Sequence, residues 1–206
     1  MNWVLFDFGG VICYPQPEED LASLARAAGC TTAEFSGAYW PYRLDYDRAV
    51  LDSRNFWQHV AGRLGRSFGE AQIAELARLD VASWMHLQEG TLALIEDMAR
   101  AGHRLALLSN APADVAEAVC GLPVAGYFEH LIFSCFLKSA KPDPECFLGA
   151  LAVMGAEPGE VTLVDDRAEN IAGAARIGLA GVRFTDPDAA RATLLRGNAD
   201  DPAATS

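Results

Sequence analysis

Basic residues are scarce in this chain, and their scarcity excludes one class of partner. The 206 residues include 16 Lys and Arg against 28 Asp and Glu, which gives a formal net charge of −12. Nucleic acids attract basic surfaces, so we expect no nucleic-acid partner. The chain also has no apolar run long enough to cross a bilayer, and no basic stretch followed by a secretory core at its start. We therefore expect a cytoplasmic protein without a membrane partner.

Cysteine patterns that indicate disulfides or zinc are also absent. The five cysteines are odd in number and scattered, none forms a CxxC pair, and the four histidines do not cluster with them. Such spacing favours neither a disulfide framework nor a zinc site. We expect five reduced thiols and assign no role to the histidines.

Short apolar runs do alternate with amphipathic segments along most of the chain. Four segments with helical spacing end at Gly102, Gly121, Gly155 and Gly178. Such alternation predicts an α/β fold with a doubly wound parallel sheet. The expected strands are Val4–Phe6, Arg104–Leu108, Leu131–Ser134, Val161–Val164 and Gly181–Phe184.

Residues 14–90 differ from the rest because they contain helical patterns and no convincing strand. Two Ser/Thr-x-x-Glu patterns, at Thr31 and at Ser67, are typical of helix N-termini. We expect an all-helical cap inserted after the first strand. The chain then divides into a core domain of residues 1–13 and 91–206 and a cap of residues 14–90. The tail from about Gly197 is expected to be disordered.

Polar residues follow the predicted strands at points that should converge on one crevice. Asp7 comes directly after the first strand and precedes Gly9 and Gly10, which allow a ligand to approach the backbone closely. Together with the residues named next, the crevice would hold three carboxylates, one hydroxyl and one ammonium. Their charges balance if Mg²⁺ and a phosphate lie between them. The further polar residues of the crevice are Ser109, Asn110, Lys141, Asp165 and Asp166.

The order and spacing of these elements resemble those of the haloacid dehalogenase-like (HAD) hydrolase superfamily. The resemblance runs from about Trp3 to Phe184, and the helical insert stands where that family carries its cap. Any one motif would be weak, but four in the family's order are specific. The matching segments are Phe6-Asp7-Phe8-Gly9-Gly10-Val11, Leu108-Ser109-Asn110, Lys141-Pro142-Asp143 and Val164-Asp165-Asp166-Arg167-Ala168-Glu169-Asn170.

The resemblance implies a role for each residue of the crevice. Asp7 would be the nucleophile that accepts a phosphoryl group as an aspartyl-phosphate. Asp7, the backbone carbonyl of Gly9 and Asp166 would ligate Mg²⁺, and Asp165 would act through a water. Asn170 would orient Lys141 or a water on the metal. The phosphate would be held by Ser109, the Asn110 amide and Lys141.

Gly9 departs from the pattern of most phosphatases in the superfamily, which have a second Asp at that position as general acid and base. The pattern Asp-x-Gly-x-Val is similar to a sugar-phosphate phosphatase-like subgroup, which implies a small, sugar-like phosphorylated metabolite as substrate. In that subgroup a cap residue, water or the substrate would supply the proton. Two alternatives stay open. One is a metal-independent 2-haloacid dehalogenase, and the other is a phosphate-binding module with little turnover.

The insert carries a dense group of aromatic and basic residues. Such residues more often fill the core of a small helical domain, and its arginines would pair with Asp45 or Asp47. They could also meet a substrate as a lid closes. We name Arg43 as the residue of this group most suited to cap specificity. The group comprises Trp40, Tyr42, Arg43, Tyr46 and Arg48.

Overall fold

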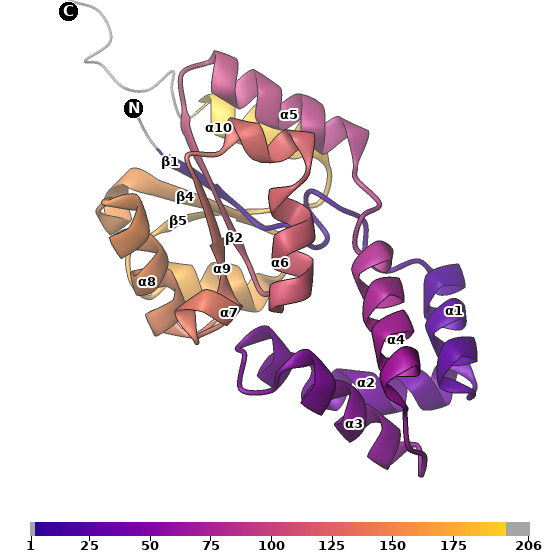
Figure 1. Cartoon of the computed structure of the whole chain (residues 1–206). Coiled ribbons are helices and arrows are strands. Elements are labelled where there is room, and N and C mark those ends of the chain that lie inside the picture. Colours follow the sequence, from indigo (N-terminus) through magenta and orange to yellow (C-terminus); the bar gives the residue numbers. More distant parts are fainter. Residues whose placement is uncertain (1–2, 197–206) are drawn as a thin grey trace, which may run out of the picture.

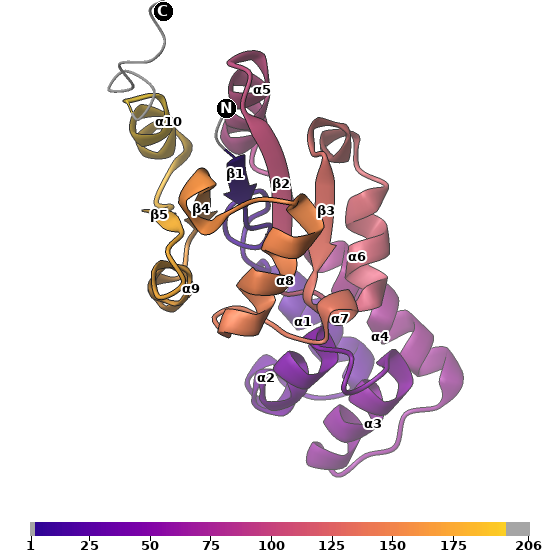
Figure 2. The same ribbon diagram turned by 90° about the vertical axis from the view of Figure 1, so that its left-hand side faces the viewer.

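A five-stranded parallel sheet forms the centre of the computed structural model, which describes residues 3–196. The strand order is β3-β2-β1-β4-β5, so the chain winds outward in both directions from β1 (Figures 1 and 2). This order confirms the doubly wound α/β prediction. The strands are β1 (Trp3–Phe6), β2 (Arg104–Ser109), β3 (His130–Phe133), β4 (Val161–Asp165) and β5 (Ala180–Arg183).

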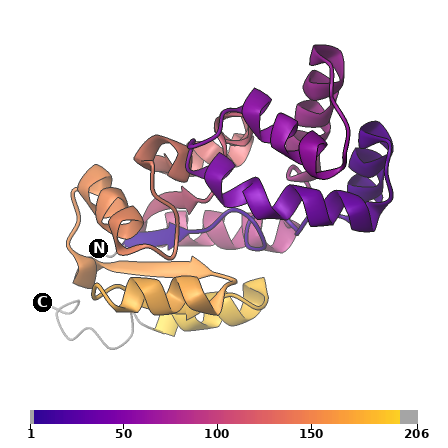
Figure 3. The ribbon, with the colours of Figure 1, turned by 90° about the horizontal axis from the view of Figure 1, so that it is seen from below.

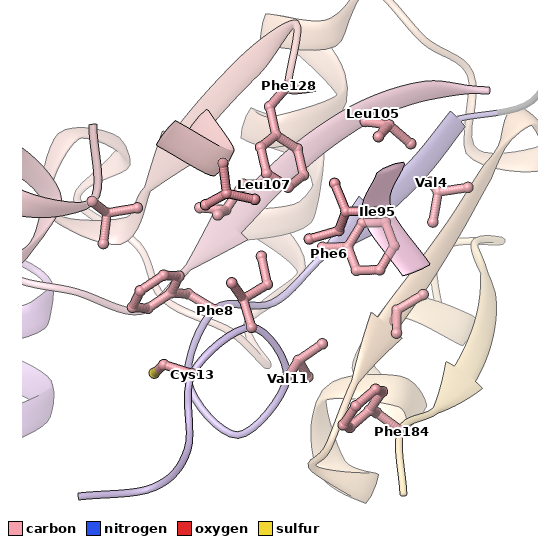
Figure 4. Packing of buried hydrophobic residues seen from close by; sticks show 14 of the residues in the cluster. Val4, Phe6, Phe8, Val11, Cys13, Ile95, Leu105, Leu107, Phe128 and Phe184 are labelled. Atoms are coloured by element: carbon pink, nitrogen blue, oxygen red, sulfur yellow. The ribbon is translucent and has the colours of Figure 1, made fainter. Parts of the chain in front are cut away.

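Helices cover both faces of the sheet because β1 is apolar on both sides. Val4 and Phe6 point into one buried cluster, whereas Trp3 and Leu5 point into another. Figure 4 shows the first cluster, in which Phe6 lies among side chains from the sheet and from α5. That face is covered by α5 (Glu89–Arg100), α6 (Ala113–Cys120) and α10 (Pro187–Arg196), and the other by α8 (Pro144–Met154) and α9 (Ala168–Ala175).

Four helices between β1 and α5 form a group with a hydrophobic core of its own (Figures 1 and 3). Tyr39 and Trp57 are fully buried there, with ring centroids 6.1 Å apart. The predicted helical cap after the first strand is confirmed, while the exact division at residues 13/14 and 90/91 stays a prediction. The helices are α1 (Glu18–Ala28), α2 (Thr32–Asp47), α3 (Ser53–Arg63) and α4 (Glu70–Ser83).

Two crossing segments join the cap to the core and pair with each other. The Tyr14 N–H donates to the carbonyl of His86 at 2.8 Å, and the Gln88 N–H donates to that of Ile12 at 2.9 Å. At the far end of the cap, α2 also contacts the core. There the Tyr46 hydroxyl donates to Asp114 at 2.9 Å. The cap is therefore tied to the core at both ends.

Some boundaries differ from the sequence-based expectations. The Thr31 capping box is present, but the one predicted at Ser67 is wrong, because Gly69 is the N-cap of α4. Ser134 does not end a strand: it begins a short helix, α7 (Ser134–Leu137). Two 3₁₀ turns, η1 (Pro123–Tyr127) and η2 (Pro158–Glu160), complete the elements.

Three expectations about the whole chain have different outcomes. All five cysteines lie within the described residues, and none of them forms a disulfide. Between residues 3 and 196 no helix combines the length and the hydropathy that a membrane span requires. The tail from Gly197 lies outside the described residues.

Candidate active site

The point where the chain changes winding direction brings the acidic motifs together. β1 and β4 are neighbours, with Phe6 in register with Val164, so Asp7 and Asp165 emerge side by side. The Asp7 N–H donates to the carbonyl of Val164 at 2.9 Å. Ligands of such sheets bind at this switch point, outside the carboxyl ends of the strands.

The turn after Asp7 is held by its own backbone and by burial. The carbonyl of Phe8 accepts hydrogen bonds from the N–H groups of Ile12 at 2.8 Å and Cys13 at 2.9 Å. Phe8 and Cys13 point into the core, as Figure 4 shows. The Phe8 N–H in turn donates to Asp7 Oδ1 at 2.6 Å, which fixes the carboxylate. Asp7 is only 6% exposed.

Gly10 allows Asp166 to lie against this turn. Its φ is +76°, and a Cβ atom built there would lie 2.5 Å from Asp166 Oδ2. Any side chain at this position would therefore push the carboxylate away. Glycine is required here both for the backbone conformation and for the close approach.

Lys141 joins two of the acidic residues. Its Nζ lies 2.8 Å from Asp7 Oδ1 and 2.7 Å from Asp165 Oδ2. The lysine is 2% exposed, so this is a buried ion-pair triad. A buried ammonium at this point can neutralise oxygens of a phosphoryl group that Asp7 contacts.

The Asn110 side chain positions Lys141 rather than facing the cavity freely. Its Nδ2 donates to the Lys141 carbonyl at 2.9 Å, and its Oδ1 accepts from the Lys141 N–H at 2.8 Å. The expectation that the Asn110 amide holds a phosphate therefore does not fit its side-chain amide. Ser109 is buried and lines the same cavity as Asp7.

Asp165 is fully engaged by hydrogen bonds inside the protein. Besides Lys141, it accepts from the Arg167 N–H at 2.9 Å. Asn170 Nδ2 lies 2.9 Å from its Oδ1 and 3.0 Å from its Oδ2. Asn170 thus orients Asp165 and reaches Lys141 only through it. Such an engaged carboxylate is suited to supporting metal ligands from behind rather than to binding a metal itself.

The electrostatics of the triad follow from burial and from its uneven charge. Burial raises the pKa of Asp7, an effect that Lys141 opposes and Asp165 reinforces. Burial also acts against the charge of Asp165, but Lys141 and the other donors lower its pKa below the ordinary value. Burial opposes the Lys141 charge as well, yet the two carboxylates outweigh it and raise its pKa. Lys141 is therefore charged at neutral pH.

Three carboxylates converge closely enough to hold a cation. Oxygen atoms of Asp7, Asp165 and Asp166 lie within 4.8 Å of one another. Hard oxygen donors of this kind fit Mg²⁺, and the space that Gly10 leaves for Asp166 keeps its carboxylate at the site. The residues present therefore fit the predicted metal. Gly9 lines the adjoining cavity, and its role as a carbonyl ligand stays a prediction.

A cavity of about 430 Å³ lies between these residues and the cap. The core contributes Asp7, Ser109, Lys141 and Asp166, which confirms that the predicted motifs meet at one place. The cap and its linkers contribute Pro15, Trp40, Arg43, Leu44, Asp47 and Trp84.

Arg43 reaches the cavity but is mostly engaged inside the cap. It is 6% exposed, and its Nε donates to Asp47 Oδ1 at 2.7 Å. Its Nη1 lies 3.3 Å from Asp80 Oδ1, and its guanidinium carbon lies 5.3 Å from the centre of the Trp84 ring. The pairing expected between an arginine and Asp47 is present. A role for Arg43 in specificity stays a prediction.

Sequence reasoning missed several residues of the cavity, among them Asp47 and Trp84. Asp47 was considered only as an ion-pair partner, and Trp84 was not singled out. An Arg and an Asp four residues apart on a helix usually indicate a surface ion pair, so the local pattern gave no reason to expect a cavity. Trp84 lies beside Gly9: a Cβ atom on Gly9 would make an ordinary van der Waals contact with its Cζ3, at 3.4 Å.

Residues 1–178 match the family model described as haloacid dehalogenase-like hydrolase. The chain belongs to this family. The chain is 26% identical over 149 residues to a flavin mononucleotide hydrolase of Arabidopsis thaliana. The match covers 70% of this chain and 57% of that protein. It is 27% identical over 195 residues to a phosphoglycolate phosphatase of Rhodospirillum rubrum, covering 85% of this chain and 76% of that protein.

Solved structures share the HAD fold at low sequence identity. A HAD family enzyme of Bacteroides thetaiotaomicron, crystallised as a variant with magnesium and inorganic phosphate, aligns with a TM-score of 0.74 and 21% identity, covering 90% of this chain and 94% of the other. The L-2-haloacid dehalogenase of Xanthobacter autotrophicus, with chloropropionic acid covalently bound, aligns with a TM-score of 0.67 and 20% identity, covering 96% and 83%. At these identities the likeness establishes the fold alone.

Proposed function

We propose that the chain is a magnesium-dependent phosphatase of small phosphomonoesters, with Asp7 as the nucleophile. The observation that carries the proposal is the placement of Lys141 between Asp7 and Asp165, with the carboxylate of Asp166 beside them. Phosphoryl transfer needs positioned opposite charge around the phosphate oxygens more than any other device. The phosphoglycolate phosphatase relative supports the same class of reaction.

In this mechanism one residue attacks phosphorus and others stabilise the charge on the phosphoryl oxygens. Asp7 attacks phosphorus in line, which forms an aspartyl-phosphate, and water then hydrolyses that acyl phosphate. Lys141 offsets negative charge on the phosphoryl oxygens, and Ser109 donates a hydrogen bond to them. Asp7, Asp166 and the Gly9 carbonyl would hold Mg²⁺, with Asp165 behind them. The ion would supply further positive charge to the phosphoryl oxygens.

Net charge favours the phosphatase over the dehalogenase. Three carboxylates converge on one ammonium, which leaves the group with two uncompensated negative charges when all are ionised. A divalent cation removes that excess. A metal-free dehalogenase would have to keep Asp166 half-buried beside the like charge of Asp165. Burial and, after it, repulsion by Asp165 already raise the pKa of Asp166.

The substrate class we propose is a small, sugar-like phosphorylated metabolite. The proposal rests on the Asp-x-Gly-x-Val pattern at Asp7 and on a cavity of about 430 Å³, a volume in the range of small-molecule sites. A panel of about a hundred phosphorylated metabolites, assayed for phosphate release with and without Mg²⁺, would identify the substrate.

The first test is hydrolysis of p-nitrophenyl phosphate. We expect activity with Mg²⁺, its loss on adding EDTA, its recovery on adding back excess Mg²⁺, and no activity in Asp7→Asn. Asp45→Asn, which changes an exposed carboxylate on the cap, is the matched control and should behave as the wild type. Activity that survives EDTA or Asp7→Asn would contradict the proposal.

Two further outcomes would identify the alternatives. Chloride release from 2-chloropropionate without metal would favour the dehalogenase. Binding of phosphate mimics with Mg²⁺, but no hydrolysis of any ester in the panel, would indicate a binding module.

A further inference from the structure

The position of the missing acid lies against the Trp84 indole ring. Gly9 stands where most phosphatases of the superfamily have their acid and base, and the Trp84 indole lies 3.4 Å from the place of its Cβ. Trp84 therefore borders the position that the missing acid would occupy. An alkyl phosphate nevertheless needs a proton on its leaving oxygen, because an alkoxide is a poor leaving group.

Few groups around the cavity can exchange a proton. The ionisable residues among those that line it are Asp7, Arg43, Asp47, Lys141, Asp166 and Arg167. Arginines do not give up protons in proteins, and Lys141 is held charged by Asp7 and Asp165. Asp7 is the proposed nucleophile, and Asp166 faces the proposed metal. Asp47 is the one cavity-lining residue of the described chain that remains.

Hydrogen bonding within the cap leaves one oxygen of Asp47 available. Arg43 Nε donates to Oδ1, and within residues 3–196 Oδ2 accepts no hydrogen bond. Asp80, on α4, shares the same guanidinium but also accepts from Tyr39 at 2.7 Å and from Gln16 at 3.2 Å. These extra donors favour the ionised form of Asp80 over that of Asp47.

One cation between two buried carboxylates favours retention of a proton. Asp47 is 7% and Asp80 is 2% exposed, and Arg43 is the guanidinium between them. Burial raises the pKa of both carboxyls, and Arg43 only partly opposes it. The charged or titratable groups that face Asp47 are Arg43 on its own helix, Asp80 on α4 and Cys135 on α7. Of the two carboxylates, Asp47 has the oxygen that accepts no hydrogen bond within the described residues, Oδ2, and this is the atom at which the pair can bind a proton.

The core itself holds Asp47 in place. Ser134 Oγ donates to the backbone carbonyl of Asp47 at 2.6 Å and accepts from the Ala111 N–H at 3.0 Å. Ala111 follows Ser109 and Asn110 at the end of β2. The end of α2 is thus fixed to the same strand ends that carry the site, so Asp47 is positioned with the site and not only with the cap.

We propose that Asp47 is the general acid and base of this enzyme, in place of the residue missing at Gly9. The proposal rests on the phosphatase function proposed above. In the first step Asp7 forms a bond to phosphorus, the bond to the leaving oxygen breaks, and that oxygen takes the proton of Asp47. In the second step the Asp47 carboxylate takes a proton from water as the water attacks the aspartyl-phosphate. This releases inorganic phosphate and restores both residues.

The test compares two esters of nearly the same shape in Asp47→Asn. p-Nitrophenyl phosphate has a leaving group that needs little protonation, whereas p-nitrobenzyl phosphate releases an alcohol that needs it. We expect kcat/KM for the benzyl ester to fall about 10²–10⁴-fold and that for the phenyl ester to change little. With the phenyl ester, a burst of one p-nitrophenol per enzyme should precede slow turnover, because the second step lacks its base.

Controls separate this role from a structural one. Asp45→Asn, on the same helix but exposed, should leave both kcat/KM values unchanged. In Asp47→Ala, added formate should restore turnover of the benzyl ester. An equal loss on both esters without rescue would assign Asp47 a structural role and overturn the proposal, as would wild-type activity in Asp47→Asn. Either result would leave the phosphatase function standing, because that depends on Asp7→Asn and EDTA.

Discussion

Replacing Gly10 with alanine tests the proposed metal site most directly, because the structure specifies what the added carbon meets. The new Cβ would lie 2.5 Å from Asp166 Oδ2, and ordinary contact begins at 3.4 Å. The Asp166 carboxylate must therefore retreat by about 0.9 Å, from 2.5 Å to 3.4 Å, or the turn must open.

The expected magnitudes follow from that displacement. Mg²⁺ requires oxygen ligands at about 2.0–2.1 Å in near-ideal octahedral geometry, so a shift of this size removes Asp166 from the ligand set. Disturbing the support of a metal ligand typically weakens metal affinity about 10–100-fold, and we expect at least that loss. Separately, an alanine in the left-handed backbone conformation of Gly10 lowers the free energy of unfolding by about 1–2 kcal/mol. For a chain of this size such a cost lowers the Tm by about 2–8 °C.

Gly102→Ala separates the two effects. Gly102 has a φ of +81°, close to that of Gly10, but a Cβ there would meet nothing within 4 Å. This variant should lose the same stability and keep its affinity for Mg²⁺. Calorimetric titration with Mg²⁺ and thermal unfolding with and without the ion would measure both quantities. Equal Mg²⁺ affinity in Gly10→Ala and Gly102→Ala would refute the placement of Asp166 at the metal.

Two further predictions concern the support of the site and the state of the thiols. Asn110→Ala removes both hydrogen bonds to the Lys141 backbone. It should lower the free energy of unfolding by about 1–3 kcal/mol in urea titrations. It should also lower kcat on p-nitrophenyl phosphate about 10²-fold, and wild-type kinetics would show that Lys141 is positioned by other contacts. Burial raises the pKa of the thiols of Cys13 and Cys146 to about 12 each. Iodoacetamide should therefore modify exposed Cys120 in the folded protein, and Cys13 and Cys146 only in urea. Peptide mapping would identify the modified thiols. Modification of Cys13 before unfolding would contradict its burial.

The sheet was predictable because its signal is local. A strand buried on both faces is a short continuous apolar run, and Leu105–Leu108 of β2 is such a run. The order of the motifs then indicated which strand ends carry polar residues. For Asp7, Lys141 and Asp165 the structure adds what the motifs could not give, namely the distances that join them into one ion-pair triad.

Element boundaries were less predictable because competing local signals have similar energies. Ser67 and Glu70 have the spacing of a capping box, yet α4 begins at Glu70 with Gly69 as its N-cap. Glycine and serine differ by only a few tenths of a kcal/mol as N-caps, so packing of the cap decides which is used. Ser134 is a second example. Its hydroxyl donates to the Asp47 carbonyl and accepts from the Ala111 N–H, and the residue begins α7 instead of ending β3.

The places of Asp47 and Trp84 on the cap side of the cavity could not be predicted, because they depend on contacts between residues far apart in the chain. Asp47 faces Asp80 through Arg43, and its backbone is held by Ser134, 87 positions further along. The contact with Asp80 and the contact with Ser134 leave no spacing that a sequence pattern could record. Trp84 meets Gly9 only because the linker that leaves the cap pairs with the one that enters it. The core motifs can therefore indicate the reaction, whereas the residues that we expect to supply its proton and shape its substrate come from the packing of α2 and α4 against the core.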